Sequence, residues 1–170
     1  MGVERYLYKE DGVKEVQSRE LDKSAPCTSL DTPEAFFLVP VGNTVVVPFT
    51  EVRVSHDEYE IEDGVVTPLR PGLYDVYGTF YDDYPNGAWR YDLHIQGNGS
   101  LDLVESHIAA PPIRLHGRQL IKCNGTTDTI SLAIAHSANV DRHFNYLIGY
   151  LHISYLNIHW IGDLNSGTVE

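Results

Sequence analysis

Glycine-containing turn pairs recur along this chain and divide it into short segments. From residue 36 onward they alternate with short runs rich in Val, Ile, Tyr, Phe and Thr. Such pairs favour tight turns between antiparallel strands. Only residues 99–107, GSLDLVESH, favour a helical turn, so we predict an all-β antiparallel sandwich or jelly roll. The pairs are Gly42-Asn43, Asp63-Gly64, Pro71-Gly72, Asn86-Gly87, Asn98-Gly99 and Asn124-Gly125.

Residues 72–80, GLYDVYGTF, alternate clearly enough to assign two faces. Successive side chains of a strand point to opposite sides, so Tyr74, Val76 and Phe80 share one side. Leu73 and Tyr77 share the other side, which is too apolar for the exposed surface of a monomer. The pattern therefore predicts a subunit interface, and its candidate residues are Leu73, Tyr77 and Tyr150.

The first 35 residues differ from the rest, with thirteen charged residues and few large apolar ones. YLYKEDGVKEV predicts a small hairpin about Asp11-Gly12. The segment that follows cannot build a core alone, so residues 1–35 are predicted to be a hairpin and an extended arm. Two interpretations stay open, a frayed terminus and an arm that docks on a neighbour. Residues 36–162 are predicted to be the jelly-roll head, and residues 163–170 a flexible tail.

Charge excludes two classes of partner. The formal net charge is −12, whereas nucleic acid and anionic membranes are bound by patches of Lys and Arg. The uncharged residues 145–161 are interrupted by Asn, His and Ser and alternate like a strand, so we predict no membrane span. Cys27 and Cys123 form no CxxC pair and are predicted to be plain thiols, with a single bridge between them as the alternative.

The sequence lacks a motif for catalysis. Its eight histidines form no HExxH pair, and no nucleophile has an evident base, so we predict no catalytic residue, metal or cofactor. A metal shared by His136 and His143 and a metal-dependent β-sandwich enzyme are the less favoured alternatives. The acidic runs HDEYEIEDG and YDDYPNG lack the ligand spacing of a calcium loop. The sequons at Asn98 and Asn124 coincide with Asn-Gly turns, which explain them better than glycosylation does.

Four stretches in order resemble one known family. They are similar to the strands of complement globular heads and tumour-necrosis-factor-like proteins. In chain order they are TVVVPFTEVRV, GVVTPLRPGLYDVYGTF, WRYDLHIQGNGS, and RLHGRQLIKCNGTTDTISLAIAH together with FNYLIGYLHISYL. The resemblance covers residues 44–156, with Gly72 and Tyr74 as its best anchors. It implies a ten-strand jelly roll, a homotrimer packed about aromatic residues, and binding rather than catalysis.

A charged N-terminal module joined to such a head, with no apolar signal-peptide core before it, resembles tailed-phage structural proteins. We therefore expect a homotrimeric virion protein that decorates a capsid or forms a head fibre or tail appendage. It would be located in the virion and attached to other virion proteins by its N-terminal arm. The alternative is a receptor- or glycan-binding head, for which the loop residues Asp82, Asp83, Tyr84 and Trp89 are the candidate contacts.

Overall fold

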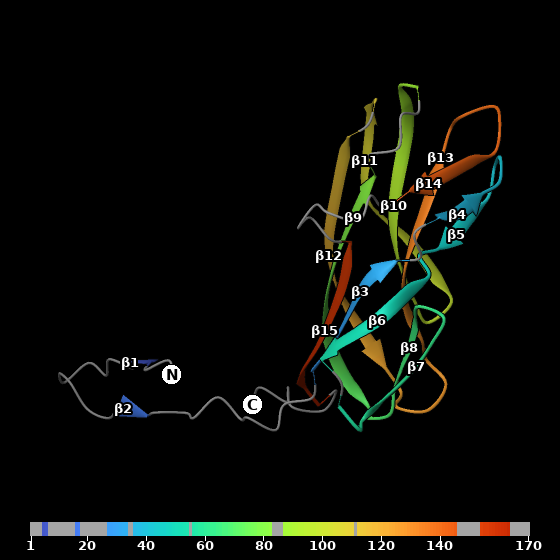
Figure 1. The fold of residues 1–170 in the computed structure, drawn as a ribbon. Coiled ribbons are helices and arrows are strands. Elements are labelled where there is room, and N and C mark those ends of the chain that lie inside the picture. Colours follow the sequence, from blue (N-terminus) through green and yellow to red (C-terminus); the bar gives the residue numbers. More distant parts are fainter. Residues whose placement is uncertain are drawn as a thin grey trace.

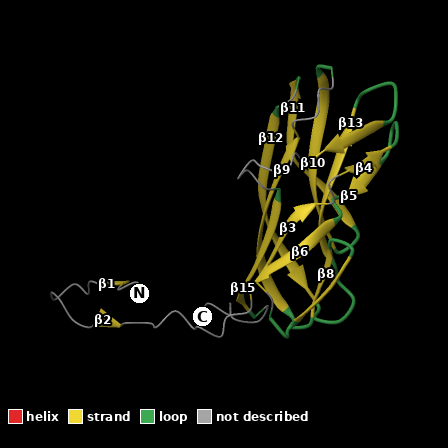
Figure 2. Cartoon of the chain, in the orientation of Figure 1, coloured by secondary structure: helices red, strands yellow, loops and turns green. Residues whose placement is uncertain are grey.

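All regular elements in the described part of the chain are β-strands (Figure 2). The computed structural model describes residues 5–6, 16–17, 27–33, 36–54, 56–82, 87–110, 112–145 and 154–163. The predicted all-β class is confirmed. The strands are β1 (Arg5–Tyr6), β2 (Val16–Gln17), β3 (Cys27–Pro33), β4 (Phe36–Val39), β5 (Thr44–Val46), β6 (Phe49–Val54), β7 (Tyr59–Glu62), β8 (Val65–Pro68), β9 (Gly72–Asp82), β10 (Trp89–Gly97), β11 (Ser100–Ala109), β12 (Ile113–Cys123), β13 (Ile130–His136), β14 (Arg142–Asn145) and β15 (Tyr155–Gly162).

Two antiparallel sheets stack to form the sandwich (Figure 1). One sheet has the strand order β12-β9-β15-β3-β6. The other has the order β11-β10-β13-β8-β7, and β5 also pairs with β13. Strands β4 and β14 form a separate two-stranded ribbon. Strands far apart in sequence, such as β3 and β15, are neighbours in the sheet, as expected of a jelly roll.

The predicted faces of the long strand β9 are confirmed by burial. Tyr74, Val76 and Phe80 lie in the core, while Leu73 and Tyr77 on the other side are half-buried. Each inward side chain removes apolar surface from water, which stabilises the fold by roughly 1.5–3 kcal/mol for a large residue. An aromatic cluster fills one end of the core, where the rings of Phe37, Phe80, Tyr91 and Phe144 contact one another.

The helical turn predicted for residues 99–107 is wrong, because residues 100–107 lie in strand β11 and Gly99 lies in the turn before it. Among the described strands, β11 is at the edge of its sheet and pairs only with β10. Most of its side chains are exposed on both faces, so the hydrophobic alternation that identifies a half-buried strand is missing.

The predicted boundary between arm and head is wrong by one strand. Cys27–Pro33 forms β3, which lies between β15 and β6 inside the sheet. Its inward side chains Thr28 and Leu30 are buried. The sandwich therefore begins at Cys27 and not at residue 36. Strands β1 and β2 pair antiparallel where the N-terminal hairpin is predicted, and its turn at Asp11-Gly12 lies outside the described residues. Apart from β1, β2 and Asp163, residues 1–26 with their predicted docking function and the predicted tail, residues 163–170, lie outside the described residues.

The Pro71-Gly72 turn before β9 packs against Trp160 of β15, which contacts the residues on either side of the turn. The Arg70 guanidinium lies 3.6 Å from the Trp160 ring centroid, and Trp160 Nε1 donates a hydrogen bond to the Pro71 carbonyl (3.4 Å). The Tyr74 hydroxyl donates to the Arg70 carbonyl at 2.5 Å. A side chain at Gly72 would collide with the Trp160 indole. Glycine is therefore required here by the close approach of the indole.

The Asn98-Gly99 and Asn124-Gly125 turns use their asparagine side chains structurally. Asn124 Oδ1 accepts backbone hydrogen bonds from Thr126 (2.9 Å) and Thr127 (3.0 Å). Asn98 Nδ2 donates to the Lys122 carbonyl, which joins this turn to β12. Such local side-chain bonds satisfy backbone groups that a tight turn leaves unpaired.

Both cysteines are free thiols, as predicted. Cys123 is only 1% exposed, and burial, with a smaller contribution from Asp128, raises the pKa of its thiol to about 12. Almost none of the Cys123 side chain is therefore in the reactive thiolate form at neutral pH. In a Cys27→Ser variant we expect Ellman's reagent to find no rapidly reacting thiol at pH 8 until guanidinium unfolds the chain. Rapid labelling of the native variant would contradict the buried placement of Cys123.

Candidate subunit interface

The outward side of the β12-β9-β15-β3 sheet carries aromatic and aliphatic side chains. Tyr77 of β9 and Tyr155 of β15 are half-buried, and their ring centroids lie 5.7 Å apart. Leu73 of β9 lies on the same face, and Leu120 of β12, the partner of Asp75, is 56% exposed. We call this surface the β9 face. Leu73 and Tyr77 thus lie together as predicted, whereas Tyr150 is outside the described residues.

Polar pairs cross the β9 face between neighbouring strands. Arg118 of β12 donates two hydrogen bonds to the Asp75 carboxylate, at 2.7 and 2.6 Å. This contact lowers the pKa of Asp75, and burial opposes the shift only in part. On the other side of the aromatic pair, Ser29 Oγ donates to Asn157 Oδ1 at 2.6 Å. Because these polar groups are already satisfied within the subunit, burying the face against a neighbour leaves few polar groups unpaired.

A second apolar surface, which the sequence did not reveal, lies on the outer side of β11. Leu101, Leu103 and Ile108 are 43%, 54% and 72% exposed. They pair with Gln96, His94 and Arg90 of β10, which alternate with buried core residues, so all three point away from the core. We call these three residues the β11 row. The sequence pattern does not identify this row, because aliphatic residues on an edge strand that is exposed on both faces do not alternate with buried ones.

The β9 face and the β11 row flank the same edge of the sandwich, where β11 and β12 end their two sheets. Side chains connect these edge strands. Glu105 Oε2 accepts a hydrogen bond from the His116 backbone N–H, and Gln119 Nε2 donates to Asp102 Oδ2. These hydrogen bonds connect the two edge strands, so the two apolar surfaces lie on either side of one joined edge.

Of the four predicted ligand-loop residues, the structure describes Asp82 and Trp89. Asp82 is 0% exposed at the end of β9, because the carboxylate turns inward like the other even-numbered residues of that strand. Trp89 is half-buried, its Nε1 is buried, and the Arg142 guanidinium lies 4.9 Å from its ring centroid. The Asp82 carboxylate is therefore closed to a ligand, and the Arg142 guanidinium occupies the Trp89 ring. Asp83 and Tyr84 lie outside the described residues.

No group of three or more His, Cys, Asp and Glu residues is arranged to hold a metal in the described ranges. His136 is buried and bonded to backbone groups, whereas His143 is exposed.

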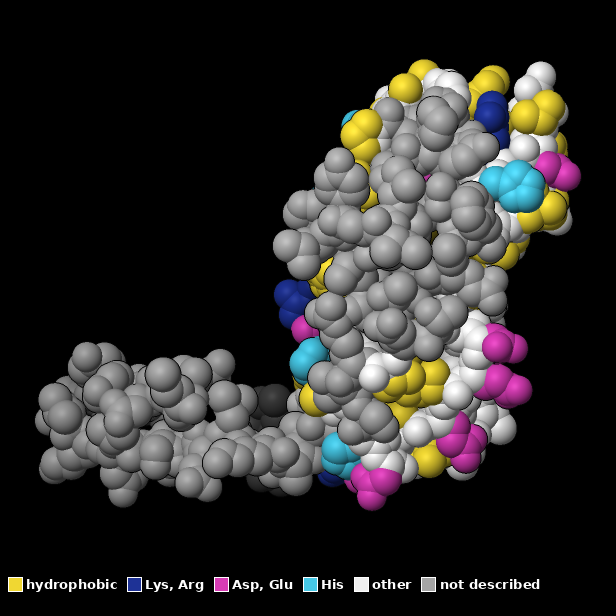
Figure 3. All heavy atoms as spheres, in the orientation of Figure 1, with side chains coloured by type: hydrophobic (Ala, Val, Ile, Leu, Met, Phe, Trp, Pro, Cys, Tyr) yellow, Lys and Arg dark blue, Asp and Glu magenta, His cyan; other side chains and the backbone are white. Residues whose placement is uncertain are grey.

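Figure 3 shows acidic side chains along the right-hand edge, where Figure 1 places the β7–β8 hairpin. That hairpin and its flanking turns carry Asp57, Glu60, Glu62 and Asp63, all exposed. None of the described elements is a helix long and apolar enough to cross a membrane.

Many solved structures resemble the sandwich, and three of them are murine APRIL, Eiger TNF and a PRD1 vertex protein. Murine APRIL has a TM-score of 0.54 and 12% identity, with 80% of this chain and 100% of that chain covered. Eiger TNF from S. frugiperda has a TM-score of 0.50 and 16% identity, with 85% and 97% covered. The vertex protein P5 of PRD1 has a TM-score of 0.56 and 13% identity, with 80% and 96% covered.

No protein-family model matches the sequence, and no curated protein matches it either. The structural likeness at these identities shows the fold alone. It agrees with the strand order of the two sheets and with the resemblance seen in the sequence. The chain therefore has the antiparallel jelly-roll fold of the complement-head and tumour-necrosis-factor-like type.

Proposed function

We propose that this chain is a non-enzymatic structural protein whose head forms a homotrimer and whose N-terminal segment attaches it to a virion. The observation that carries the proposal is the pair of apolar surfaces, the β9 face and the β11 row, at one edge of the sandwich. Exposed apolar surface of this kind marks an interaction site. Jelly-roll domains of this type typically form homotrimers, which supports three copies in the assembly.

The two surfaces differ in chemistry, which bears on the symmetry of the assembly. The β9 face is aromatic and polar at its borders, whereas the β11 row is aliphatic. A two-fold dimer brings the same patch of both subunits together, whereas contact between unlike patches is heterologous and can close into a ring. We infer that the β11 row of one subunit packs on the β9 face of the next.

The virion role is supported by two observations. One structure with the same fold is the vertex protein of PRD1, a viral protein. The N-terminal residues 1–26 precede the first strand of the sandwich and are strongly charged, as a segment that binds another protein would be. The described residues give no specific support to the receptor- or glycan-binding alternative, because Asp82 is buried and the Arg142 guanidinium lies over the half-buried Trp89 ring.

The attachment is tested by deleting residues 1–26, which keeps strand β3 in the head. Gradient-purified virus particles are probed by immunoblot after complementation with the full chain or the truncated chain. We expect the full chain in the particles and the truncated chain only in the soluble fraction, still with the mass of a trimer. Truncated chain in the particles, or full chain absent from them, would contradict the proposed role.

A further inference from the structure

Two Asn-Gly turns lie close together at one end of the sandwich. The Asn98-Gly99 turn connects β10 to β11, and the Asn124-Gly125 turn follows β12. The Asn98 Nδ2 group donates a hydrogen bond to the carbonyl of Lys122 at the end of β12. An asparagine before glycine is especially open to attack on its side-chain amide, because glycine has no side chain to hinder the backbone nitrogen that follows. In the third such pair, Asn86 lies outside the described residues.

The side-chain oxygen of Asn124 is surrounded by hydrogen-bond donors from its own loop. It accepts from the backbone N–H groups of Thr126, Thr127 and Asp128, at 2.9, 3.0 and 3.3 Å. The Thr126 hydroxyl also donates to it, at 3.1 Å. Successive backbone N–H groups that point to one place form a site suited to negative charge. Asn124 Oδ1 therefore lies where a negatively charged oxygen would be stabilised.

The same hydrogen bonds fold the Asn124 side chain over the backbone that follows it. The bond from the Thr126 N–H closes a ring, known as an Asx turn, that contains the Asn124 side-chain carbon Cγ and the Gly125 nitrogen. These two atoms are the ones that react in deamidation, so the turn holds the reacting atoms in one small ring. When the nitrogen attacks Cγ, negative charge develops on Oδ1, where the donors already point.

The turn at Asn98 lacks this arrangement. Its Nδ2 group donates to Lys122 on β12, and its Oδ1 faces the Cys123 thiol, a weak donor, at 4.0 Å. Among the hydrogen bonds of the described residues, none runs from a backbone N–H to Asn98 Oδ1. The hydroxyl of Ser100, which takes the place of Thr126 in this turn, donates to Asp102 at 2.9 Å. The Asn98 side chain is thus held toward another strand, with no comparable donors for a charge on its oxygen.

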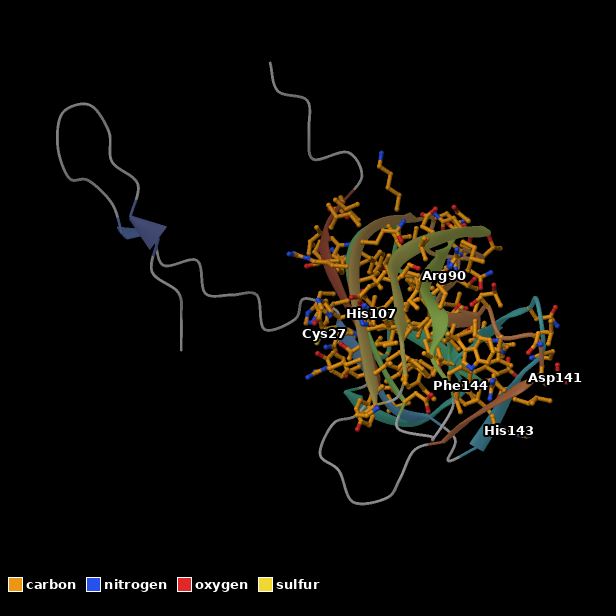
Figure 4. All side chains as sticks on the ribbon, turned by 90° about the horizontal axis from the view of Figure 1, so that it is seen from above. Cys27, Arg90, His107, Asp141, His143 and Phe144 are labelled. Atoms are coloured by element: carbon orange, nitrogen blue, oxygen red, sulfur yellow. The ribbon has the colours of Figure 1, made fainter. Side chains whose placement is uncertain are left out.

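Exposure does not separate the two sites, because both asparagines are open to water. The loops that connect the strands lie outside the packed interior of the sandwich. Figure 4 shows this for Asp141, in the loop before β14, which lies at the rim, whereas Phe144 of β14 lies toward the interior. Water, the one reactant that the chain does not supply, therefore reaches both turns. The difference between the turns lies in their hydrogen bonds.

We propose that Asn124 is a site of spontaneous deamidation, which the folded turn favours over Asn98. The Gly125 nitrogen gives up its proton to solvent and forms a bond to Asn124 Cγ. The bond between Cγ and Nδ2 then breaks, and the amide nitrogen takes up a proton and leaves as ammonia. Water opens the resulting cyclic imide at either of its carbonyls, which gives aspartate or isoaspartate at position 124.

Either product changes the turn that packs beside the start of β9. Both carry a carboxylate close to Asp128, whose own carboxylate accepts a hydrogen bond from the Asn124 N–H at 2.7 Å, and like charges held close together repel each other. Isoaspartate also lengthens the backbone of the turn by one carbon atom. The turn has no spare room at Gly125, where an added Cβ would meet the Pro71 nitrogen. Conversion therefore loosens the contact between this turn and the residues that precede β9.

Peptide mapping of the full chain by mass spectrometry, after incubation at pH 7.5, tests the proposal. We expect Asn124 to convert about tenfold or more faster than Asn98 in the folded chain. In guanidinium the two sites should convert at similar rates, because each precedes a glycine and then a hydroxyl residue. Asn124 should also convert faster in the folded chain than in the unfolded one. This excess separates a preorganised site from a mobile loop, which can at most equal the unfolded chain.

A matched pair of variants tests the donors directly. Thr126→Val removes the hydroxyl that donates to Asn124 Oδ1, so conversion at Asn124 in the folded chain should slow several-fold relative to the same variant unfolded. Ser100→Ala, at the equivalent position after Asn98, should leave conversion at Asn98 unchanged. Equal rates at the two asparagines in the folded chain would overturn the proposal. So would a folded rate at Asn124 no higher than its unfolded rate, or an unchanged rate in Thr126→Val.

Discussion

Replacing Tyr77 and Tyr155 together with alanine should convert the assembled protein into single chains of 19.1 kDa at micromolar concentration. Their rings contact each other at the centre of the β9 face, where a neighbouring subunit would bury them. Aromatic residues at the centre of an interface commonly cost 2 kcal/mol or more when truncated, which is about 30-fold in the dissociation constant for each. Light scattering coupled to size-exclusion chromatography measures the mass.

Two further variants make this result specific. Val140→Ala is the matched control, because Val140 is 51% exposed but lies at a loop tip outside both surfaces, and its mass should not change. Ile108→Asp tests the β11 row, since a carboxylate there would be buried unpaired if that row packs on a neighbour. An assembled Tyr77→Ala, Tyr155→Ala protein would show that the β9 face is not the interface. An assembled Ile108→Asp protein would exclude the β11 row.

Gly72→Ala should destabilise the sandwich by about 1–3 kcal/mol, because the added methyl group overlaps the Trp160 indole. To make room the indole must move, which disturbs its contact with Arg70 and its bond to the Pro71 carbonyl. For a chain of this length that loss lowers the melting temperature by roughly 2–12 °C. Thermal unfolding monitored by circular dichroism gives the value.

Two variants control for this prediction. One carries Trp160→Ala alone, and the other carries Trp160→Ala together with Gly72→Ala. If the clash with the indole causes the loss, the glycine substitution should cost much less once the indole is removed, and the double-mutant cycle shows that coupling. Equal costs in both backgrounds would mean that the indole does not set the requirement for glycine. In that case the cause would be the φ of +157° at residue 72 or the neighbouring Gly162 carbonyl, which the added methyl group also approaches.

The sequence predicts those parts of the fold in which one face of a strand is buried. Strand β9 is the clearest case, because Tyr74, Val76 and Phe80 alternate with residues that face outward. Strand β3 could not be recognised, because Cys27–Pro33 contains mostly small and polar residues in a highly charged part of the chain. Its place depends on pairing with β15, more than a hundred residues later, which no local pattern records.

The candidate site was predictable only in part, for the same physical reason. Leu73 and Tyr77 were found because an apolar residue on the outward side of an alternating strand is unusual. The β11 row escaped notice because an edge strand exposed on both faces has no core-facing period. Asp82 was misplaced because it belongs to a polar run that is typical of a loop, whereas β9 extends to this residue and turns its carboxylate inward.

The most direct test of the proposed assembly is the mass of the unaltered full chain in solution, measured by light scattering during size-exclusion chromatography at several micromolar concentrations. A homotrimer of 19.1-kDa chains has a mass of about 57 kDa, and we expect that value to hold on dilution through the micromolar range. A mass of one chain at every concentration would contradict the interface and the function built on it. A mass of two chains would contradict the heterologous three-fold contact.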